Sequence, residues 1–211
     1  MTTAMADKPQ TTGKPRGSYA KTEEKRRTIL DAALEVFAQS GYRKGSIREV
    51  AERVGMSEAG LLHHFPNKSA LLSAVLERRD ELAREFLDFD NVQGIVTLAG
   101  LVRLARYNAS IPGVVELYCV LSAEATAPDH PAHRYFVDRY NDTRVSVTRT
   151  FSTLASSGQL RAGVEPASAA RATIALMDGL QVQWLLDPDG VDMGERLELL
   201  ARIVQGARSR K

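Results

Sequence analysis

The 211-residue sequence predicts an all-α protein of about nine helices. Hydrophobic residues recur at intervals of three and four along most of the chain, and no segment shows the alternating pattern of a half-buried strand. Residues that start and stop helices separate these periodic segments. The longest stretch without an acidic or basic side chain, Asn91 to Val102, has twelve residues, whereas a membrane-spanning helix needs about 20. We therefore expect a soluble globular protein.

Composition and charge favour an intracellular protein with a basic front. The first ten residues, MTTAMADKPQ, lack the apolar run of a secretory signal. The single cysteine, Cys119, cannot form an internal disulfide, which predicts a cytoplasmic location. Residues 1–70 contain twelve Lys and Arg against eight Asp and Glu, and the rest of the chain is slightly acidic. A basic front suits a nucleic-acid partner, although a solvated tail has the same composition.

Residues 1–20 are predicted to form a flexible basic arm, because they are rich in Thr, Gly, Pro, Lys and Arg and nearly devoid of apolar side chains. The first helix is expected to begin at Thr22, which can cap it, and Glu23 and Glu24 complement the positive end of its dipole. Gly41 is expected to end this helix.

Two short helices follow. Ser46 and Glu49 form a capping box at the start of the second helix, and Gly55 provides a turn. Ser57 caps a third helix, which Pro66 stops. Two short capped helices joined by a glycine turn, with another helix packed in front, predict a helix-turn-helix.

The rest of the chain is expected to be helical. The predicted helices cover residues 67–86, 92–108, 113–125, 131–155, 166–186 and 193–207. The last two carry apolar stripes at helical spacing, which form either internal core or a contact with a second subunit. The stripe residues are Ile174, Met177, Leu180, Trp184, Met193, Leu197, Leu200 and Val204.

The third helix contains adjacent histidines, His63 and His64. If Leu61 and Phe65 face the core, Ala59, Gly60 and His63 point outward, and Leu62 and His64 flank them. Neighbouring helix positions diverge by about 100 degrees, so the histidine pair lacks the i, i+4 spacing of helical metal ligands. The only acid on this helix, Glu58, lies at its start, and no Ser or Cys is positioned to be activated as a nucleophile. The pair is therefore either a solvated surface feature or a contact with an external partner.

Residues 22–76 resemble the N-terminal domain of the TetR family of bacterial transcriptional regulators. Members carry a stretch close to G-x-S-x-x-x-L-Y-x-H-F-x-x-K-x-x-L, and many positions agree at fixed spacing. The matching residues here are Gly55, Ser57, Leu61, Leu62, His63, His64, Phe65, Lys68 and Leu71. The departure is Leu62, which replaces a tyrosine whose hydroxyl contacts a phosphate, and we expect apolar packing there instead.

The resemblance implies a DNA-binding site on the helix-turn-helix. The residues that it places at or near DNA, mostly at phosphates, are Ser46, Arg48, Ser57, His63, His64 and Lys68. Hydroxyl groups, free helix N-termini and a lysine at a helix start all favour anionic oxygens. On the outward face, which includes Gly60, Glu58 could accept from a cytosine amino group and Ala59 could contact a thymine methyl.

The resemblance also implies the organisation of the whole chain. It predicts a helix-turn-helix DNA-binding domain at 21–70 and a helical ligand-binding and dimerisation domain at 71–211. The last two helices would form the homodimer, and a small-molecule effector would release a repressor from its double-stranded operator. Aromatic and sulfur-containing residues of the bundle are candidates for lining the effector pocket: Tyr107, Tyr118, Cys119, Met177 and Trp184.

The sequence also allows a metal site and two other functions. His130 and His133, near Glu124 and Asp129, could ligate a metal, but a polar helix start explains them as well. We predict no metal and no cofactor. A helical-bundle enzyme with an accessory helix-turn-helix is disfavoured, because no nucleophile–base constellation or phosphate-binding glycine loop is found. A protein-binding adaptor that has lost DNA affinity is the other alternative, and Leu62 favours it.

Overall fold

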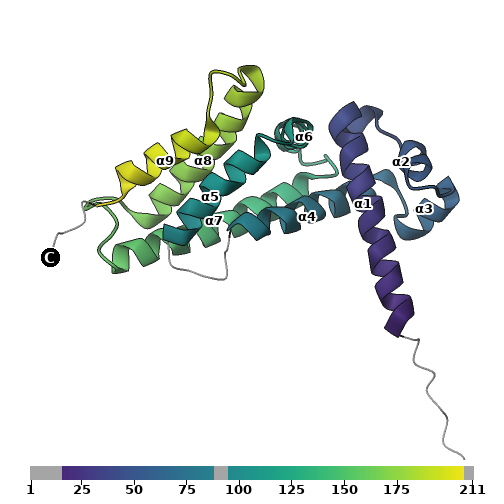
Figure 1. The fold of residues 1–211 in the computed structure, drawn as a ribbon, viewed down its shortest axis with the longest axis horizontal. Helices are drawn as coiled ribbons and strands as arrows, with labels where there is room; N and C mark the ends of the chain where they lie inside the picture. Colours follow the sequence, from purple (N-terminus) through teal and green to yellow (C-terminus); the bar gives the residue numbers. More distant parts are fainter. Residues whose placement is uncertain (1–15, 88–94, 207–211) are drawn as a thin grey trace, which may run out of the picture.

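The computed structural model describes residues 16–87 and 95–206, and these residues form nine α-helices (Figure 1). Apart from one isolated bridge between Leu160 and Gln205, the described residues contain no β-structure. No helix among them is long and apolar enough to cross a membrane. The helices are α1 (Arg16–Lys44), α2 (Ile47–Arg53), α3 (Glu58–His64), α4 (Lys68–Leu87), α5 (Ile95–Asn108), α6 (Pro112–Glu124), α7 (His133–Ser156), α8 (Pro166–Leu186) and α9 (Met193–Val204).

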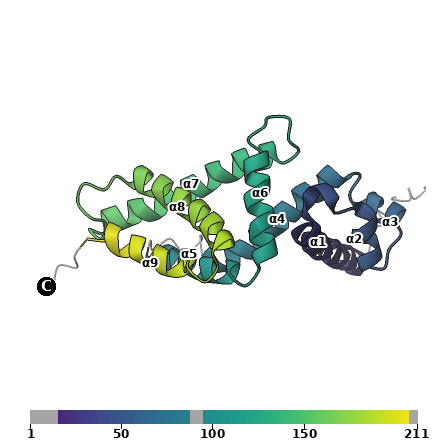
Figure 2. The same cartoon turned by 90° about the horizontal axis from the view of Figure 1, so that it is seen from above.

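The molecule is elongated, with α1, α2 and α3 at one end and α5, α8 and α9 towards the other (Figure 1). Helices α4 and α7 run between the two ends, and α6 stands between the groups (Figure 2). One apolar core joins α1, α2 and α3 to the first half of α4, to α6 and to the start of α7. A second core is built from α5, α8, α9 and the second half of α7. The helix-turn-helix therefore shares a core with α4 and α6.

The all-α expectation is confirmed, and several predicted helix ends need correction. The first helix starts at Arg16, so residues 16–20 are helical and Thr22 is not a cap. Residues 1–15 of the predicted arm lie outside the described residues. Gly41 has a φ of 72°, which breaks the helical geometry as expected. Helix α7 begins at His133, and Pro131 precedes the helix rather than lying in its first turn.

The apolar stripes of the last two helices are mainly internal. Leu180 and Trp184 of α8 and Leu197 and Val204 of α9 are buried within the single chain. Of the two readings of the stripes, internal core is the one that the structure supports.

Candidate DNA-binding interface

Local hydrogen bonds fix the two short helices. Ser46 Oγ accepts from the backbone N–H of Glu49 at 3.0 Å, and Ser57 Oγ accepts from that of Gly60 at 3.1 Å. Both serines therefore cap their helices as predicted. Gly55, between the helices, has a φ of 66°, in the left-handed region that favours glycine. The turn and the two caps together set the direction of α3.

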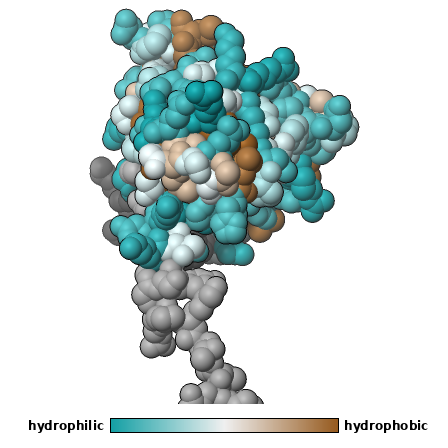
Figure 3. Space-filling model, turned by 90° about the vertical axis from the view of Figure 1, so that its right-hand side faces the viewer, coloured by the Kyte–Doolittle hydropathy of each residue, from teal (hydrophilic) through white to brown (hydrophobic). Residues whose placement is uncertain are grey.

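Helix α3 presents one face to the core and the other to solvent. Leu61 is fully buried and Phe65 is 2% exposed, whereas Ala59 and His63 are exposed. The predicted orientation of the histidine-bearing face is thus confirmed. The surface at the end that carries α1, α2 and α3 is mostly hydrophilic, with small apolar areas (Figure 3). A short exposed helix with small outward residues has the dimensions to enter a major groove.

Two of the predicted phosphate-contacting cations already have partners within the chain. Arg48 Nε lies 2.8 Å from Glu52 Oε1 on the exposed surface of α2. Lys68 Nζ donates to the backbone oxygen of Arg43 at 3.1 Å and lies 4.6 Å from the centre of the Tyr42 ring. Burial lowers the pKa of Lys68. The Lys68 ammonium is therefore held in one place at the start of α4.

Positively charged side chains of α1 extend this face, and they were not among the DNA-binding residues predicted from the sequence. His64 is partly buried, and burial, followed by the charges of His63, Lys25 and Arg26, lowers the pKa of His64. The Arg26 guanidinium lies 4.3 Å from the centre of the Phe65 ring. The run of charged residues from 21 to 27 was visible in the sequence. Its proximity to α3 depends on how α1 packs across the helix-turn-helix.

Leu62 corrects one expectation. It is 36% exposed and belongs to neither apolar core of the described residues. The expected apolar packing of Leu62 is therefore wrong for the isolated chain, because this position faces solvent beside the histidines. The candidate DNA-binding face thus carries an exposed apolar side chain at the position of Leu62.

The predicted effector-pocket residues do not come together in one cavity. Tyr107 lines a cavity between α1, α4, α5 and α6, and Met177 lines two others within the bundle. Tyr118, Cys119 and Trp184 line none of these three cavities. Burial raises the pKa of the Cys119 thiol to about 11, and its Sγ contacts Gln181 Oε1 at 3.7 Å.

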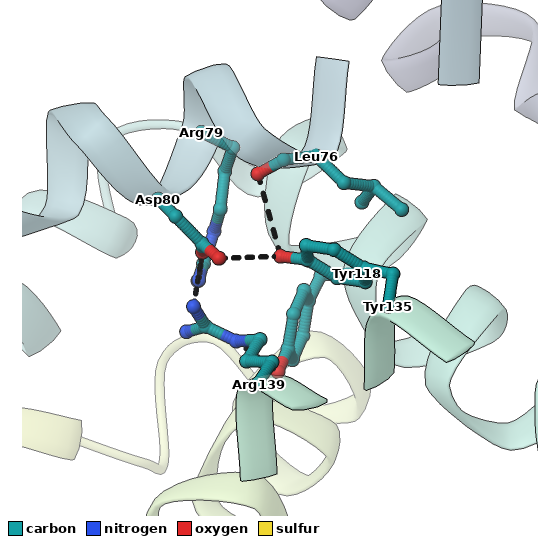
Figure 4. Close-up of polar contacts among 6 residues, drawn as sticks. All are labelled: Leu76, Arg79, Asp80, Tyr118, Tyr135 and Arg139. Carbon is teal, nitrogen blue, oxygen red and sulfur yellow. Dashed lines mark hydrogen bonds and ion pairs between the residues drawn. The ribbon is translucent and has the colours of Figure 1, made fainter. Parts of the chain in front are cut away.

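A buried polar cluster joins α4, α6 and α7 beside these cavities (Figure 4). The Asp80 carboxylate of α4 accepts from Tyr135 Oη at 2.8 Å and contacts the guanidinium groups of Arg79 and Arg139. Arg139 Nε donates to Tyr118 Oη at 2.8 Å. The three charged side chains of the cluster lie well inside the protein, because less than a fifth of each is exposed. Sequence periodicity gave no sign of this cluster, since its members come from three separate helices.

His130 and His133 have partners within the chain. His130 Nδ1 accepts from the backbone N–H of Ala132, and His133 Nδ1 lies 2.8 Å from the backbone oxygen of Ala125. His130 Nε2 lies 3.7 Å from Glu124 Oε2. Within residues 16–87 and 95–206, no group of three or more His, Cys, Asp or Glu side chains is arranged to hold a metal.

A helix-turn-helix with an exposed second helix, joined to an α-helical bundle, defines a class of DNA-binding regulators. Two family models match separate parts of the chain. Residues 29–75 match bacterial regulatory proteins of the tetR family, and residues 117–208 match the C-terminal domain of BetI-type transcriptional repressors. The chain belongs to the TetR family, and it is a DNA-binding transcriptional regulator.

Individual relatives agree with this assignment. The transcriptional regulator TtgR of Pseudomonas putida is 25% identical over 189 residues, which cover 84% of this chain and 88% of that protein. A transcriptional repressor of Mycobacterium tuberculosis is 34% identical over 98 residues, and the match spans about half of that relative, 48% of its length.

Solved structures share the fold over most of the chain. A protein whose structure explains control of antibiotic production by bacterial hormones is 30% identical, covers 87% of this chain and 98% of its own, and has a TM-score of 0.69. The complex of SmeT with triclosan has a TM-score of 0.75 at 20% identity, covering 88% of this chain and 93% of its own. A regulator from Saccharomonospora viridis in complex with choline has a TM-score of 0.71 at 24% identity, covering 88% and 100%.

Proposed function

We propose that the protein is a homodimeric repressor that inserts α3 into the major groove of a two-fold symmetric operator. The observation that carries this proposal is the orientation of α3, whose Leu61 and Phe65 face the core while Ala59 and His63 face solvent. A helix oriented in this way can place its small residues against base edges while its flanks reach the phosphates.

Some side chains on and around α3 would contact phosphates, and others would contact base edges. We assign phosphate contacts to Ser46, Arg48, Ser57, His63, His64 and Lys68. The ion pair between Arg48 and Glu52 lies on the surface, where such pairs contribute at most about 1 kcal/mol, so a phosphate can replace it. Glu58, Ala59 and Gly60 would face base edges, and Lys25 and Arg26 would add positive charge beside α3.

The dimer would form through faces of α8 and α9 that the single chain leaves exposed. Val182 and Leu186 of α8 and Leu199 and Ile203 of α9 are large apolar side chains in contact with solvent. Pairing these faces about a two-fold axis would remove them from water and place two copies of α3 on one side of the duplex.

The repressor would respond to a small molecule bound in the helical bundle. SmeT binds triclosan and the Saccharomonospora viridis regulator binds choline, so chemically different ligands suit this fold. An effector causes the repressor to release DNA only if it binds the DNA-competent and incompetent forms with different affinities. The difference in binding free energy is typically about 1 to 3 kcal/mol.

Operator binding by charge-altered variants tests the DNA interface. A random-sequence selection with the full chain should recover two-fold symmetric sites. On such a site, Lys68→Gln should weaken binding to specific and unrelated DNA alike and reduce the slope of log affinity against log salt by about 1. The matched control is Arg149→Gln, an exposed cation in the second half of α7, which lies far from α3 and outside α8 and α9 and should bind like the wild type.

The triple variant His63→Gln, His64→Gln and Lys68→Gln gives the strongest test. If this variant binds the operator as tightly as the wild type does, then α3 and its flanks are not the DNA-binding site. A selection without any enriched sequence would favour the adaptor alternative, which the exposed Leu62 supports.

A further inference from the structure

A cavity lies where the helix-turn-helix meets the bundle, between α1, α4, α5 and α6. Its volume is about 210 Å³. At the packing density of protein interiors, such a space holds on the order of ten non-hydrogen atoms. We call it the junction cavity. Its walls are largely apolar, formed by Leu34, Leu82, Ala83, Leu104, Ile111 and Val114.

One wall of the junction cavity contains a buried amide without a partner. Asn108 is 3% exposed, and its Nδ2 makes no hydrogen bond to any described residue. A buried donor in this state is unfavourable, so it needs an acceptor. A second cavity that Asn108 borders has a volume of about 10 Å³, at or below the space that a water molecule requires. The acceptor is therefore expected from the side of the junction cavity.

A buried cation lies in the same wall. Arg79 is 7% exposed, and the hydrogen bond that it makes to the described residues is a long one, 3.4 Å from Nη1 to Asp80 Oδ1. The guanidinium group has five N–H donors. Its carbon lies 4.4 Å from the centre of the Tyr118 ring, a contact through the guanidinium face that leaves donors at its edge for an acceptor. The rim of the cavity also carries Asp31 and Glu35, but Asp31 pairs with Arg78 at 3.1 Å and Glu35 pairs with Arg53 at 3.0 Å.

The charge behind this wall is positive. Asp80 is shared between Arg79 and Arg139, so one carboxylate faces two guanidinium groups (Figure 4). A further acid that interacts with Arg79 and Arg139, Asp178, accepts from Tyr140 Oη at 2.8 Å, and burial raises the pKa of Asp178. An anion in the junction cavity would thus meet the donors of Asn108 and Arg79, backed by a carboxylate that two guanidinium groups share. A cation would meet only the rim carboxylates of Asp31 and Glu35, which already have arginine partners.

We propose that the junction cavity binds the effector and that the effector is a compact apolar carboxylate, whose oxygens accept from Asn108 and Arg79. This inference rests on the proposed function and deepens it, because it assigns the effector a site and a chemical class. The site includes α1, so its occupancy bears directly on how the helix-turn-helix sits against the bundle. Of the five pocket residues predicted from the sequence, Tyr107 lines this cavity.

Calorimetry on the full-length protein without DNA tests the proposal. The probes are benzoate and hexanoate, their neutral counterparts benzamide and hexanamide, and choline as a cation. The carboxylates should bind at least about tenfold more tightly than their amides, since the amides lose the charge-assisted bonds. Choline binding as tight as that of the carboxylates, or no carboxylate binding at millimolar concentration, overturns the proposal.

Two variants locate the binding. Asn108→Leu removes the unpartnered amide at similar volume, so the protein should stay folded and lose about tenfold in carboxylate affinity. Val114→Phe fills the cavity and should abolish binding. The control, Asn141→Leu, changes an exposed asparagine of α7 and should leave binding unchanged. Wild-type affinity in both Asn108→Leu and Val114→Phe would exclude the junction cavity.

A separate operator titration distinguishes the two proposals. If benzoate binds with the expected dependence on Asn108 but leaves operator affinity unchanged, the carboxylate site stands and effector release fails. If the unliganded protein binds no operator, the repressor proposal fails without affecting the calorimetric result.

Discussion

His64 is the residue whose chemistry links the candidate DNA-binding face to pH. In the free protein its pKa lies below the ordinary value of 6.5, because burial and the neighbouring cations disfavour the imidazolium form. A phosphate placed against this ring would have the opposite effect, because a nearby negative charge favours the protonated form. DNA binding would then be coupled to proton uptake at His64.

We therefore predict that operator affinity rises as the pH falls from about 8 to about 6 at constant ionic strength. Because the pKa of His64 is lowered in the unbound protein and a phosphate would raise it, the complex should hold more of the protonated form than the unbound protein does in this window, so acidification favours the complex. Fluorescence anisotropy with a labelled operator measures the effect, and His64→Gln should flatten the profile. A profile that is identical in the wild type and the variant would show that His64 takes up no proton on binding.

Single residues also show which interactions the sequence can reveal. The caps at Ser46 and Ser57 were predictable because each serine bonds a backbone group three residues ahead. Leu62 was not, since its exposure depends on what α1 and α4 leave uncovered. The positions of Lys25 and Arg26 beside His64 likewise result from packing between helices rather than from local sequence.

At the scale of elements, Asp80 ties α4 to α7. Its carboxylate accepts from Tyr135 Oη and contacts the guanidinium groups of Arg79 and Arg139 (Figure 4). Helix α4 starts at the candidate DNA-binding face with Lys68 and reaches this cluster after three turns. The cluster therefore anchors the helix that connects the two ends of the molecule.

Removing this carboxylate should destabilise the protein strongly. Asp80→Ala leaves two buried guanidinium groups without their shared partner, which typically costs about 3 to 5 kcal/mol. Urea unfolding followed by circular dichroism measures the loss. The control is Asp138→Ala, which breaks an exposed pair with Arg134 at 2.7 Å and should cost less than about 1 kcal/mol. Similar small losses in both variants would mean that the buried cluster does not hold α4 to α7.

Helix boundaries were predictable where a local signal is strong. Helix α8 spans Pro166–Leu186 as expected, because Pro166 fits the first turn and the Glu165 carboxylate caps two backbone N–H groups. The predicted start of α1 at Thr22 is wrong, because the helix begins at Arg16. A threonine inside a helix and a threonine that caps one look alike in the sequence. The stripes of α8 and α9 were ambiguous, because periodicity shows that a face is apolar and not what covers it.

At the scale of the whole molecule, apolar surface remains on α8 and α9 after the single chain has folded. Leu186 is 81% exposed and Ile203 is 52% exposed, and Val182 and Leu199 lie on the same two helices. Side chains of this size are unfavourable in water. Their concentration on the last two helices supports the proposed dimer interface at that place.

The combined variant Leu186→Glu and Ile203→Glu should convert the proposed dimer into a monomer, because it places four carboxylates in an interface that excludes water. Light scattering should give twice the chain mass of 23.1 kDa for the wild type and the single chain mass for the variant. Val145→Glu is the control, since Val145 is an apolar residue of α7 that is 58% exposed. Circular dichroism must show the same helicity in all three proteins.

A wild-type mass of one chain, or a control variant as monomeric as the double variant, would contradict a dimer interface on α8 and α9. The monomeric variant should also lose most of its operator affinity, because a single α3 reads only one half-site.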